Sequence, residues 1–181
     1  MFDNFEIWWV TGAQLLYGGD AVVAVDGHSK EMVEGLNKSG NIPVKIVYKG
    51  TANSSNEVEA VMKAANNDSK CIGIITWMHT FSPAKMWIKG LQALEKPLLH
   101  FHTQYNTDIP WDTIDMDFMN LNQSAHGDIE FGHICTRMRV ARKVVVGHWK
   151  SVEAQKQIAV WARAAAGRAD AHNVRCLMFG M

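Results

Sequence analysis

The feature that most constrains the fold of this sequence is a regular alternation between short apolar runs and segments with helical spacing. The runs are rich in β-branched and aromatic residues. Most of them are continuous rather than alternating, as parallel strands covered on both faces are. They occupy residues 7–10, 44–48, 71–77, 97–101, 143–146 and 174–179. The pattern therefore predicts up to six strands buried inside a layered structure.

The intervening segments carry apolar residues at every third or fourth position, which is the pattern of amphipathic helices. Four of them span residues 22–36, 58–65, 84–91 and 152–162. Ser54 followed by Glu57 is a capping-box pattern, which predicts where one helix begins. Residues 117–139 also have helical character, interrupted by Gly127 and Gly132.

Six β/α units in series predict an α/β fold. The expected architecture is a doubly wound, flavodoxin/Rossmann-like parallel sheet of five to six strands with helices on both faces. The chain has no charge block, low-complexity tract or Pro/Gly-rich linker. We therefore expect residues 1–181 to form a single domain.

Composition excludes several classes of protein. Lys+Arg and Asp+Glu both number 18 among 181 residues, so there is no basic field for nucleic-acid binding. The longest apolar run, residues 72–78, is far shorter than a membrane span, and the N-terminus does not resemble a signal peptide. The three cysteines are widely spaced and lack a CxxC motif, which argues against a disulfide framework or a thiolate zinc site. A cytoplasmic chain with no membrane partner is expected.

Amides, imidazoles and aromatic rings follow the predicted strands, at the sheet edge where such folds bind ligands. Gln14 lies after the first run, His79 after the third, His102 and Gln104 after the fourth, and His148 after the fifth. Amides and imidazoles pair with hydroxyl groups, and rings cover C–H surface, so this edge suits a polyhydroxylated ligand. The alternative is that the loops are simply polar. No GxGxxG, GK[ST] or GxSxG motif supports a nucleotide site or a serine hydrolase.

Two sets of residues could bind a divalent metal. His100 and His102 share one face of a strand, and Asp115 and Asp117 follow in the next loop. Nitrogen and oxygen donors of this kind suit a divalent cation. Isolated patterns of this kind have low specificity, and a histidine that is hydrogen-bonded or exposed to solvent is the favoured interpretation of each.

The second set lies downstream, where Glu130 comes four residues after His126 and three residues before His133. These spacings bring the three side chains to one side if the segment is helical.

Four blocks of the sequence resemble the L-arabinose isomerase family. Residues 12–18 (GAQLLYG) resemble its G-S-Q-x-L-Y-G loop, and residues 77–88 and 97–106 resemble its next two blocks. The longest match is residues 110–127 (PWDTIDMDFMNLNQSAHG). The resemblance covers essentially the whole chain and identifies it as equivalent to the family's N-terminal domain. Ala13 and Ser124 stand where the family usually has Ser and Thr.

The resemblance implies an aldose–ketose isomerase that interconverts L-arabinose and L-ribulose with a divalent cation, preferably Mn²⁺. It also implies a homo-oligomer, a trimer or hexamer, with sites at subunit boundaries. The family's metal ligands lie in later parts of its chain, and nothing here aligns with them. By motif, the substrate-binding residues are expected to be Gln14, Leu16, Tyr17, Phe81, Gln123 and His126.

His126 and Glu130 are the candidate catalytic residues. The ordinary pKa of histidine, about 6.5, suits proton transfer during sugar-ring opening. If the chain is active alone, the groups available to replace the missing metal site are Glu130, His133, His100, His102 and Asp117. The competing hypothesis is a non-catalytic sugar-binding or assembly domain of that enzyme. A flavodoxin-like cofactor binder rests on fold alone.

Seven Trp residues are many for a chain of this size. They favour a Trp-rich core. The alternative is a wide aromatic interface, because five of them, Trp8, Trp9, Trp87, Trp111 and Trp149, are enough for some to lie outside one small core. We therefore predict that the chain self-associates.

Overall fold

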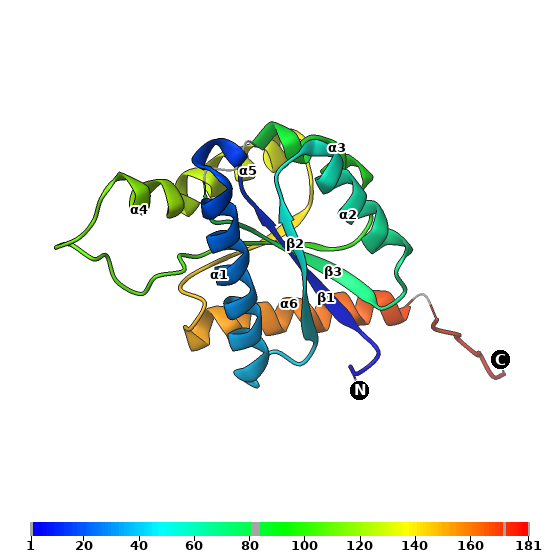
Figure 1. Ribbon diagram of the computed structural model, residues 1–181. Coiled ribbons are helices and arrows are strands. Elements are labelled where there is room, and N and C mark those ends of the chain that lie inside the picture. Colours follow the sequence, from blue (N-terminus) through cyan, green and yellow to red (C-terminus); the bar gives the residue numbers. More distant parts are fainter. Residues whose placement is uncertain (1, 81–83, 172, 181) are drawn as a thin grey trace.

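The protein forms one five-stranded, all-parallel sheet. A computed structural model describes residues 2–80, 84–171 and 173–180. The strands are β1 (Glu6–Gly12), β2 (Lys45–Ala52), β3 (Cys71–Met78), β4 (Leu98–His102) and β5 (Arg142–Val146). Their order in the sheet is β2-β1-β3-β4-β5, with every neighbouring pair parallel (Figure 1). The predicted α/β class and parallel sheet are confirmed.

Helices connect the strands and cover both faces of the sheet. The α-helices are α1 (Gly19–Lys38), α2 (Ser55–Asn67), α3 (Ile88–Ala93), α4 (Met116–Leu121), α5 (Ser124–Arg137) and α6 (Val152–Ala171). Two short 3-10 helices, η1 (Leu15–Tyr17) and η2 (Ala84–Trp87), precede α1 and α3. In Figure 1, α1 and α6 lie on one side of the strands, with α2, α3 and α5 on the other. The fold is therefore doubly wound.

Each face of the sheet has its own aromatic centre. Under α1 and α6, Trp9 meets Trp77 and Phe101 edge-to-face, with ring centroids 6.1 Å apart in both pairs. Under α2, α3 and α5, Trp87 meets Phe131 edge-to-face at 5.1 Å. Such pairs add about 0.5–1.5 kcal/mol beyond their buried area. Six of the seven Trp residues are buried, so the Trp-rich core is confirmed.

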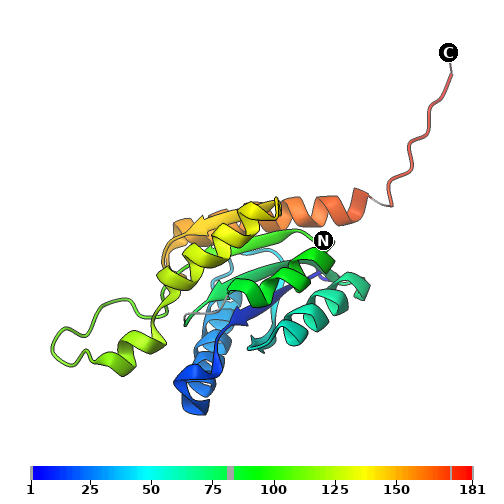
Figure 2. The same ribbon diagram turned by 90° about the horizontal axis from the view of Figure 1, so that it is seen from above.

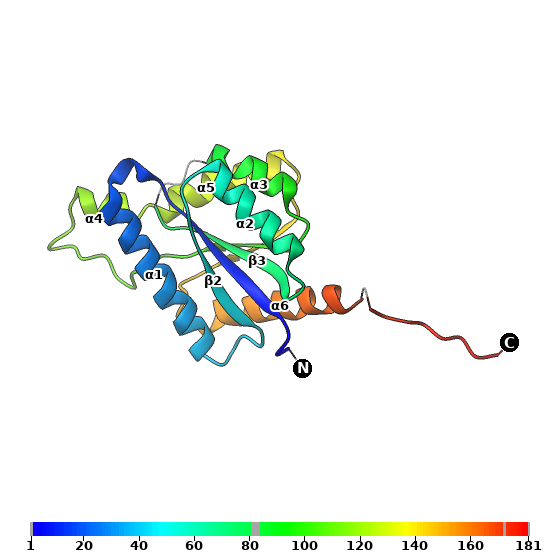
Figure 3. The ribbon, with the colours of Figure 1, turned by 45° about the vertical axis from the view of Figure 1, so that its right-hand side comes forward.

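The expected sixth strand is wrong. Residues 174–180 pair with no strand of the sheet and extend away from the body of the fold (Figure 2, Figure 3). Four apolar side chains of this segment, those of Val174, Leu177, Met178 and Phe179, are exposed. The residue types favour a strand, but strand propensity expresses packing and pairing against a neighbour, which this segment lacks.

The expected helix over residues 117–139 is two helices, and the break is not at a glycine. It falls at Asn122, whose backbone leaves the helical region and whose side-chain amide donates to the Phe118 carbonyl at 2.9 Å. An Asn side chain competes in this way for a backbone partner. Gly127 and Gly132 both lie within α5. The capping box at Ser54 is confirmed, since the Glu57 N–H donates to Ser54 Oγ at 3.3 Å.

No helix among residues 2–80, 84–171 and 173–180 combines the length and apolar character needed to cross a membrane. All three cysteines are described and all are free, as expected.

Trp149 joins α1 to the loops at the carboxyl edge of the sheet. Its ring packs on Gly35 of α1 so closely that a Cβ there would lie 2.5 Å from Trp149 Cζ3. Its Nε1–H donates to the Tyr105 carbonyl at 3.0 Å. Gly35 thus leaves the room that lets Trp149 hold the segment after β4 in place.

We expect Gly35→Ala to lower the free energy of unfolding by about 1–3 kcal/mol, the usual effect of overpacking a core. Gly27→Ala is the matched control in the same helix, because nothing lies within 4 Å of the added Cβ. That variant should be neutral or more stable by up to about 1 kcal/mol, since Ala favours a helix over Gly. Urea unfolding measures both, and equal effects of the two substitutions would contradict the packing described.

Candidate functional site

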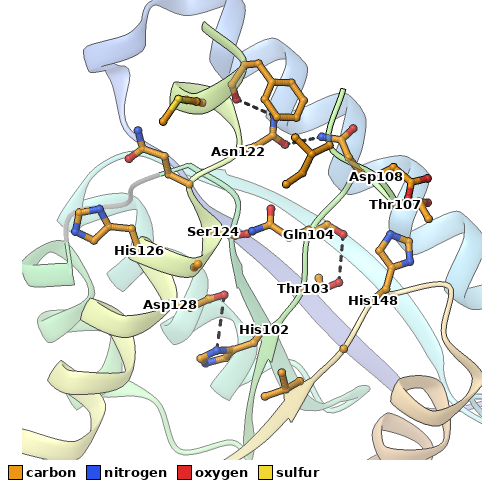
Figure 4. A pocket seen from close by; sticks show the side chains of 18 of the residues that line it. His102, Thr103, Gln104, Thr107, Asp108, Asn122, Ser124, His126, Asp128 and His148 are labelled. Carbon is orange, nitrogen blue, oxygen red and sulfur yellow. Dashed lines mark hydrogen bonds and ion pairs between the residues drawn. The ribbon is translucent and has the colours of Figure 1, made fainter. Parts of the chain in front are cut away.

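A cavity of about 910 Å³ opens at the carboxyl edge of the sheet, beyond the ends of β4 and β5. The segment after β4, the helix α4, the first turns of α5 and the residues that follow β5 surround it (Figure 4). Ligands in parallel α/β sheets bind at this edge because loops converge there while the strands stay rigid. Its place at this edge makes it the candidate site.

The cavity has one apolar side and one polar side. Ile109, Ile114, Phe118 and Met119 supply the apolar side. On the polar side, Asn106 Nδ2 donates to Asn122 Oδ1 at 2.9 Å, which ties the segment after β4 to the break between α4 and α5. An apolar wall facing a few fixed amides is typical of small-molecule sites.

Tyr105 anchors the segment after β4 to α1. Its hydroxyl group donates to Glu31 Oε2 at 2.6 Å, and its ring stacks on His28 with centroids 3.6 Å apart. Hydrogen bonding to Glu31 raises the pKa of Tyr105 to about 12. With Trp149 on its other side, Tyr105 fixes the start of the loop that forms the cavity wall.

Three side chains meet at the inner end of the cavity. Asp128 of α5 lies with its Oδ1 2.7 Å from His100 Nε2, and the other ring nitrogen of His100, Nδ1, lies 3.1 Å from His102 Nε2. His100 and Asp128 are almost completely buried, whereas His102 is half-buried. Asp128 and His102 both line the cavity (Figure 4). These contacts form one continuous chain of hydrogen bonds across β4 and α5.

Burial keeps this cluster neutral. It raises the pKa of Asp128, opposed in part by a backbone hydrogen bond from Met78. Burial also lowers the pKa of His100, and the neighbouring His102 and Arg142 lower it further. The pKa of His102 is lowered by burial and then by Arg142. Because each charged form is disfavoured, a protonated carboxyl beside two neutral imidazoles is the stable form.

Two of the predicted site residues, Gln123 and His126, line this cavity. Gln123 donates to Asn120 Oδ1 at 3.3 Å, and His126 Nε2 lies 3.9 Å from Glu130 Oε1. The predicted one-sided placement of His126 and Glu130 is therefore present on α5. In Figure 4 the His126 ring and the Asp128 carboxyl leave α5 in different directions, and only Asp128 points toward His102.

Two of the first-loop candidates, Gln14 and Leu16, are not among the residues that line this cavity. Gln14 is half-buried and precedes η1, and its Nε2 is buried without a hydrogen-bond partner. Leu16 is 79% exposed. Tyr17 ends η1. Phe81 lies outside the described residues. For these four residues the sugar-binding role remains a prediction.

Of the predicted metal candidates, only His100 and His102 belong to a cluster of three potential ligands among the described residues. Among the residues that the structure describes, one group of three potential ligands has donor atoms within 4.8 Å of one another, namely His100, His102 and Asp128. Asp117 and His133 are exposed and lie outside it. Both nitrogens of His100 already take part in hydrogen bonds, and burial raises the pKa of the Asp128 carboxyl, which disfavours the carboxylate form that binds metals. Mn²⁺ favours oxygen-rich sites, so this cluster does not fit that ion.

Asp128 is the site residue that sequence reasoning missed. The buried face of α5 consists of Ser124, Gly127, Asp128, Phe131 and Cys135. The spacing of Asp128 and Phe131, three residues apart, places the carboxyl on the apolar face of the helix. A carboxylate at such a position is a signal, because an isolated buried charge is too costly to persist without a partner.

Comparison with known proteins agrees with the resemblance seen in the sequence. The family model described as the L-arabinose isomerase N-terminal domain matches residues 1–173. The L-arabinose isomerases of Phocaeicola vulgatus and Bacteroides thetaiotaomicron are 74% and 73% identical to this chain, over 179 and 180 residues. The enzyme of Koribacter versatilis is 54% identical over 177 residues.

These alignments cover 98–99% of this chain but 35% of each relative, so the chain spans about a third of their length. Both the match to the family model and the identity over nearly the whole chain are far above what chance resemblance gives. The chain belongs to the L-arabinose isomerase family and corresponds to its N-terminal domain.

Proposed function

We propose that this chain binds L-arabinose or L-ribulose in the cavity at the carboxyl edge, as the substrate-contacting part of an L-arabinose isomerase. The observation that carries the proposal is the meeting of Gln123 and His126, both predicted sugar contacts, in the wall of one cavity. The homology to L-arabinose isomerases supports the choice of sugar.

The wall chemistry matches a pentose. An amide both donates and accepts hydrogen bonds, as a hydroxyl group does, so Gln104, Asn106 and Gln123 can pair with vicinal hydroxyls. The apolar side formed around Phe118 and Met119 can cover the C–H face of the sugar. One wall thus offers the two kinds of surface that a sugar presents.

In the reaction, hydrogen moves between adjacent carbons of the sugar. A divalent metal, Mn²⁺ by family resemblance, would supply Lewis-acid polarisation of the sugar oxygens. Because the His100–His102–Asp128 cluster does not fit that ion, we place the metal ligands outside the described residues of this chain. His126 binds a sugar hydroxyl group and holds or moves its proton, and Glu130 places a carboxylate 3.9 Å from its Nε2.

A second candidate, an assembly domain without turnover, is favoured by the exposed apolar groups beside the cavity. Trp111 is 77% exposed, Met116 64% and Met119 49%. We propose that copies of the chain associate through this surface, as the homo-oligomeric state implied by the family resemblance would require. Light scattering at tens of micromolar should then give a mass above that of the monomer, and a strictly monomeric mass would contradict this surface as an interface.

We expect the chain to bind L-arabinose without converting it to ketose, with or without Mn²⁺. The physical reason is that no metal site of the required type is formed among its described residues. Calorimetric titration with L-arabinose and a ketose-formation assay, with Mn²⁺ and after chelation, measure the two properties. Metal-dependent turnover by this chain would show that the missing donors lie within it, and the absence of binding would remove the sugar site.

We expect His126→Asn to weaken L-arabinose binding by about tenfold or more, while the melting temperature stays unchanged. His126 is exposed on α5, so the smaller polar side chain should not disturb packing, and the loss corresponds to one hydrogen bond to a charged or strongly polar group. His133→Asn is the matched control, since His133 is exposed on the same helix but does not line the cavity. Equal affinities of the two variants would remove His126 from the site.

A further inference from the structure

The hydrogen bonds of the Asp128, His100 and His102 cluster must run in a single direction. A neutral imidazole has one donor nitrogen and one acceptor nitrogen. His100 uses both, at 2.7 Å toward Asp128 and at 3.1 Å toward His102. If Asp128 donates to His100, then His100 must donate to His102. If Asp128 accepts, then His102 must donate to His100.

The two directions differ by one proton at the outer end. When Asp128 is protonated, it donates to His100 Nε2, the Nδ1–H of His100 donates to His102 Nε2, and His102 carries its proton on Nδ1. That Nδ1 lies 4.0 Å from Asp128 Oδ2, beyond hydrogen-bond distance. His102 and Asp128 both line the cavity, and the His102 side chain is 29% exposed, so a ligand oxygen that enters beside the Asp128 carboxyl can reach this N–H.

We propose that Asp128, His100 and His102 form a proton relay that ends at His102 Nδ1, where it exchanges a proton with an oxygen of a polyhydroxylated ligand in the cavity. The geometry that carries this is the unbroken chain of two hydrogen bonds between a buried carboxyl and a half-buried imidazole. Its ligand class rests on the function proposed above.

The proton transfer balances along the chain. His102 Nδ1 gives its proton to the ligand oxygen. His102 Nε2 takes the proton of His100 Nδ1, and His100 Nε2 takes the proton of Asp128. The ligand gains one proton, and the negative charge left in the protein is the Asp128 carboxylate, which now accepts the N–H of His100. The reverse sequence removes a proton from the ligand, so the relay serves as an acid and as a base.

The groups around the relay shift the pKa values of its members. Burial disfavours the carboxylate, so Asp128 holds its proton to a higher pH than an exposed Asp does. The backbone hydrogen bond from Met78, at the end of β3, opposes this shift, whereas the guanidinium of Arg142 on β5 lowers the pKa of His100 and of His102. Arg142 is itself fixed by donation to the Gly132 carbonyl at 3.1 Å. A general acid–base group works best when its pKa lies near the working pH.

A purely structural role for the cluster is the alternative. The buried bond between Asp128 and His100 also holds α5 on β4, and its loss would destabilise the fold. Asp128→Asn separates the two roles, because the amide has the shape of the carboxyl and can donate to His100 Nε2 in the same way. It keeps the hydrogen bonds of the neutral cluster but has no proton to transfer.

The first test follows the ring protons by ¹⁵N NMR of the histidines and ¹³C NMR of the carboxyl as the pH is raised. In the wild-type chain, Asp128 should lose its proton in the same transition in which His100 and His102 both move their proton from Nδ1 to Nε2. In Asp128→Asn both rings should keep the proton on Nδ1 throughout. A carboxyl that titrates without any change at His102 would overturn the relay.

His102→Gln provides a second variant, which leaves the buried Asp128–His100 bond intact and keeps the relay testable if Asp128→Asn does not fold. In His102→Gln the joint transition of the carboxyl and the ring protons should disappear, because the imidazole that takes the proton from His100 is gone. Asp170→Asn is the control for removal of a carboxylate, since Asp170 is exposed near the end of α6. A transition that persists unchanged in His102→Gln would show that His102 takes no part.

The second test asks whether the relay acts on a sugar, and uses L-arabinose as the probe. In ring opening, the C1–O5 bond breaks, O5 receives the His102 proton, and the hydroxyl proton on C1 leaves to water. The wild-type chain should therefore accelerate exchange between the two anomers, measured by NMR exchange spectroscopy. Asp128→Asn should reduce that acceleration by about tenfold or more, while L-arabinose affinity and melting temperature stay unchanged and Asp170→Asn behaves as wild type.

The outcomes separate this proposal from the proposed function. If L-arabinose does not bind, the sugar site fails, and the ring-proton transition still decides the relay. If L-arabinose binds but anomer exchange in the wild-type chain equals that in buffer, or is the same in Asp128→Asn, the assignment of proton transfer to His102 is overturned while the sugar site stands.

Discussion

The buried hydrogen bond between Asp128 and His100 is the interaction on which the candidate site depends. It joins α5 to β4 at a point where both side chains are almost completely excluded from water. Removing one partner would leave a buried polar atom of the other without its hydrogen bond, at a cost of about 1–3 kcal/mol. The bond fixes how α5 lies on the sheet, and the first turns of α5 carry Gln123 and His126 into the cavity wall. Stability and site geometry therefore have the same source.

Most of the fold could be predicted because parallel strands and amphipathic helices leave local patterns. The continuous run at β3, residues 71–78, is buried at every position, as a strand covered on both faces must be. Residues 174–179 are also mostly apolar, although they include Arg175, and they form no strand because no neighbouring strand pairs with them. The break at Asn122 also escaped prediction, since an Asn side chain can either tolerate a helix or compete for its carbonyls. The two glycines, Gly127 and Gly132, had indicated an interruption of the helix, but both lie within α5.

The site could be predicted only where a residue sits in a recognisable motif. Gln123 and His126 were found in that way and lie in the cavity wall. The HxH spacing placed His100 and His102 on one face of a strand, which is confirmed by their 3.1 Å contact. The sequence offered Asp115 and Asp117 of the next loop beside these two histidines, but the carboxyl that meets them is that of Asp128, 28 residues from His100. A contact between residues this far apart in the sequence cannot be predicted from local spacing. The position of Asp128 on the apolar face of α5 did, however, point to a buried partner.

The size and shape of the cavity bear on how the chain meets a sugar. At about 910 Å³ it is near the upper end of small-molecule sites, and a pentose is far smaller than the ligands such cavities usually enclose. A sugar that touches Gln123 and His126 therefore contacts one wall and leaves the rest of the space open. Metal-assisted isomerisation requires water to be excluded and both reacting oxygens to be polarised, which one wall cannot do. The arrangement suits the proposed role of holding one side of a substrate, and the proposed relay from Asp128 to His102 would supply protons there without exposing a carboxylate to solvent.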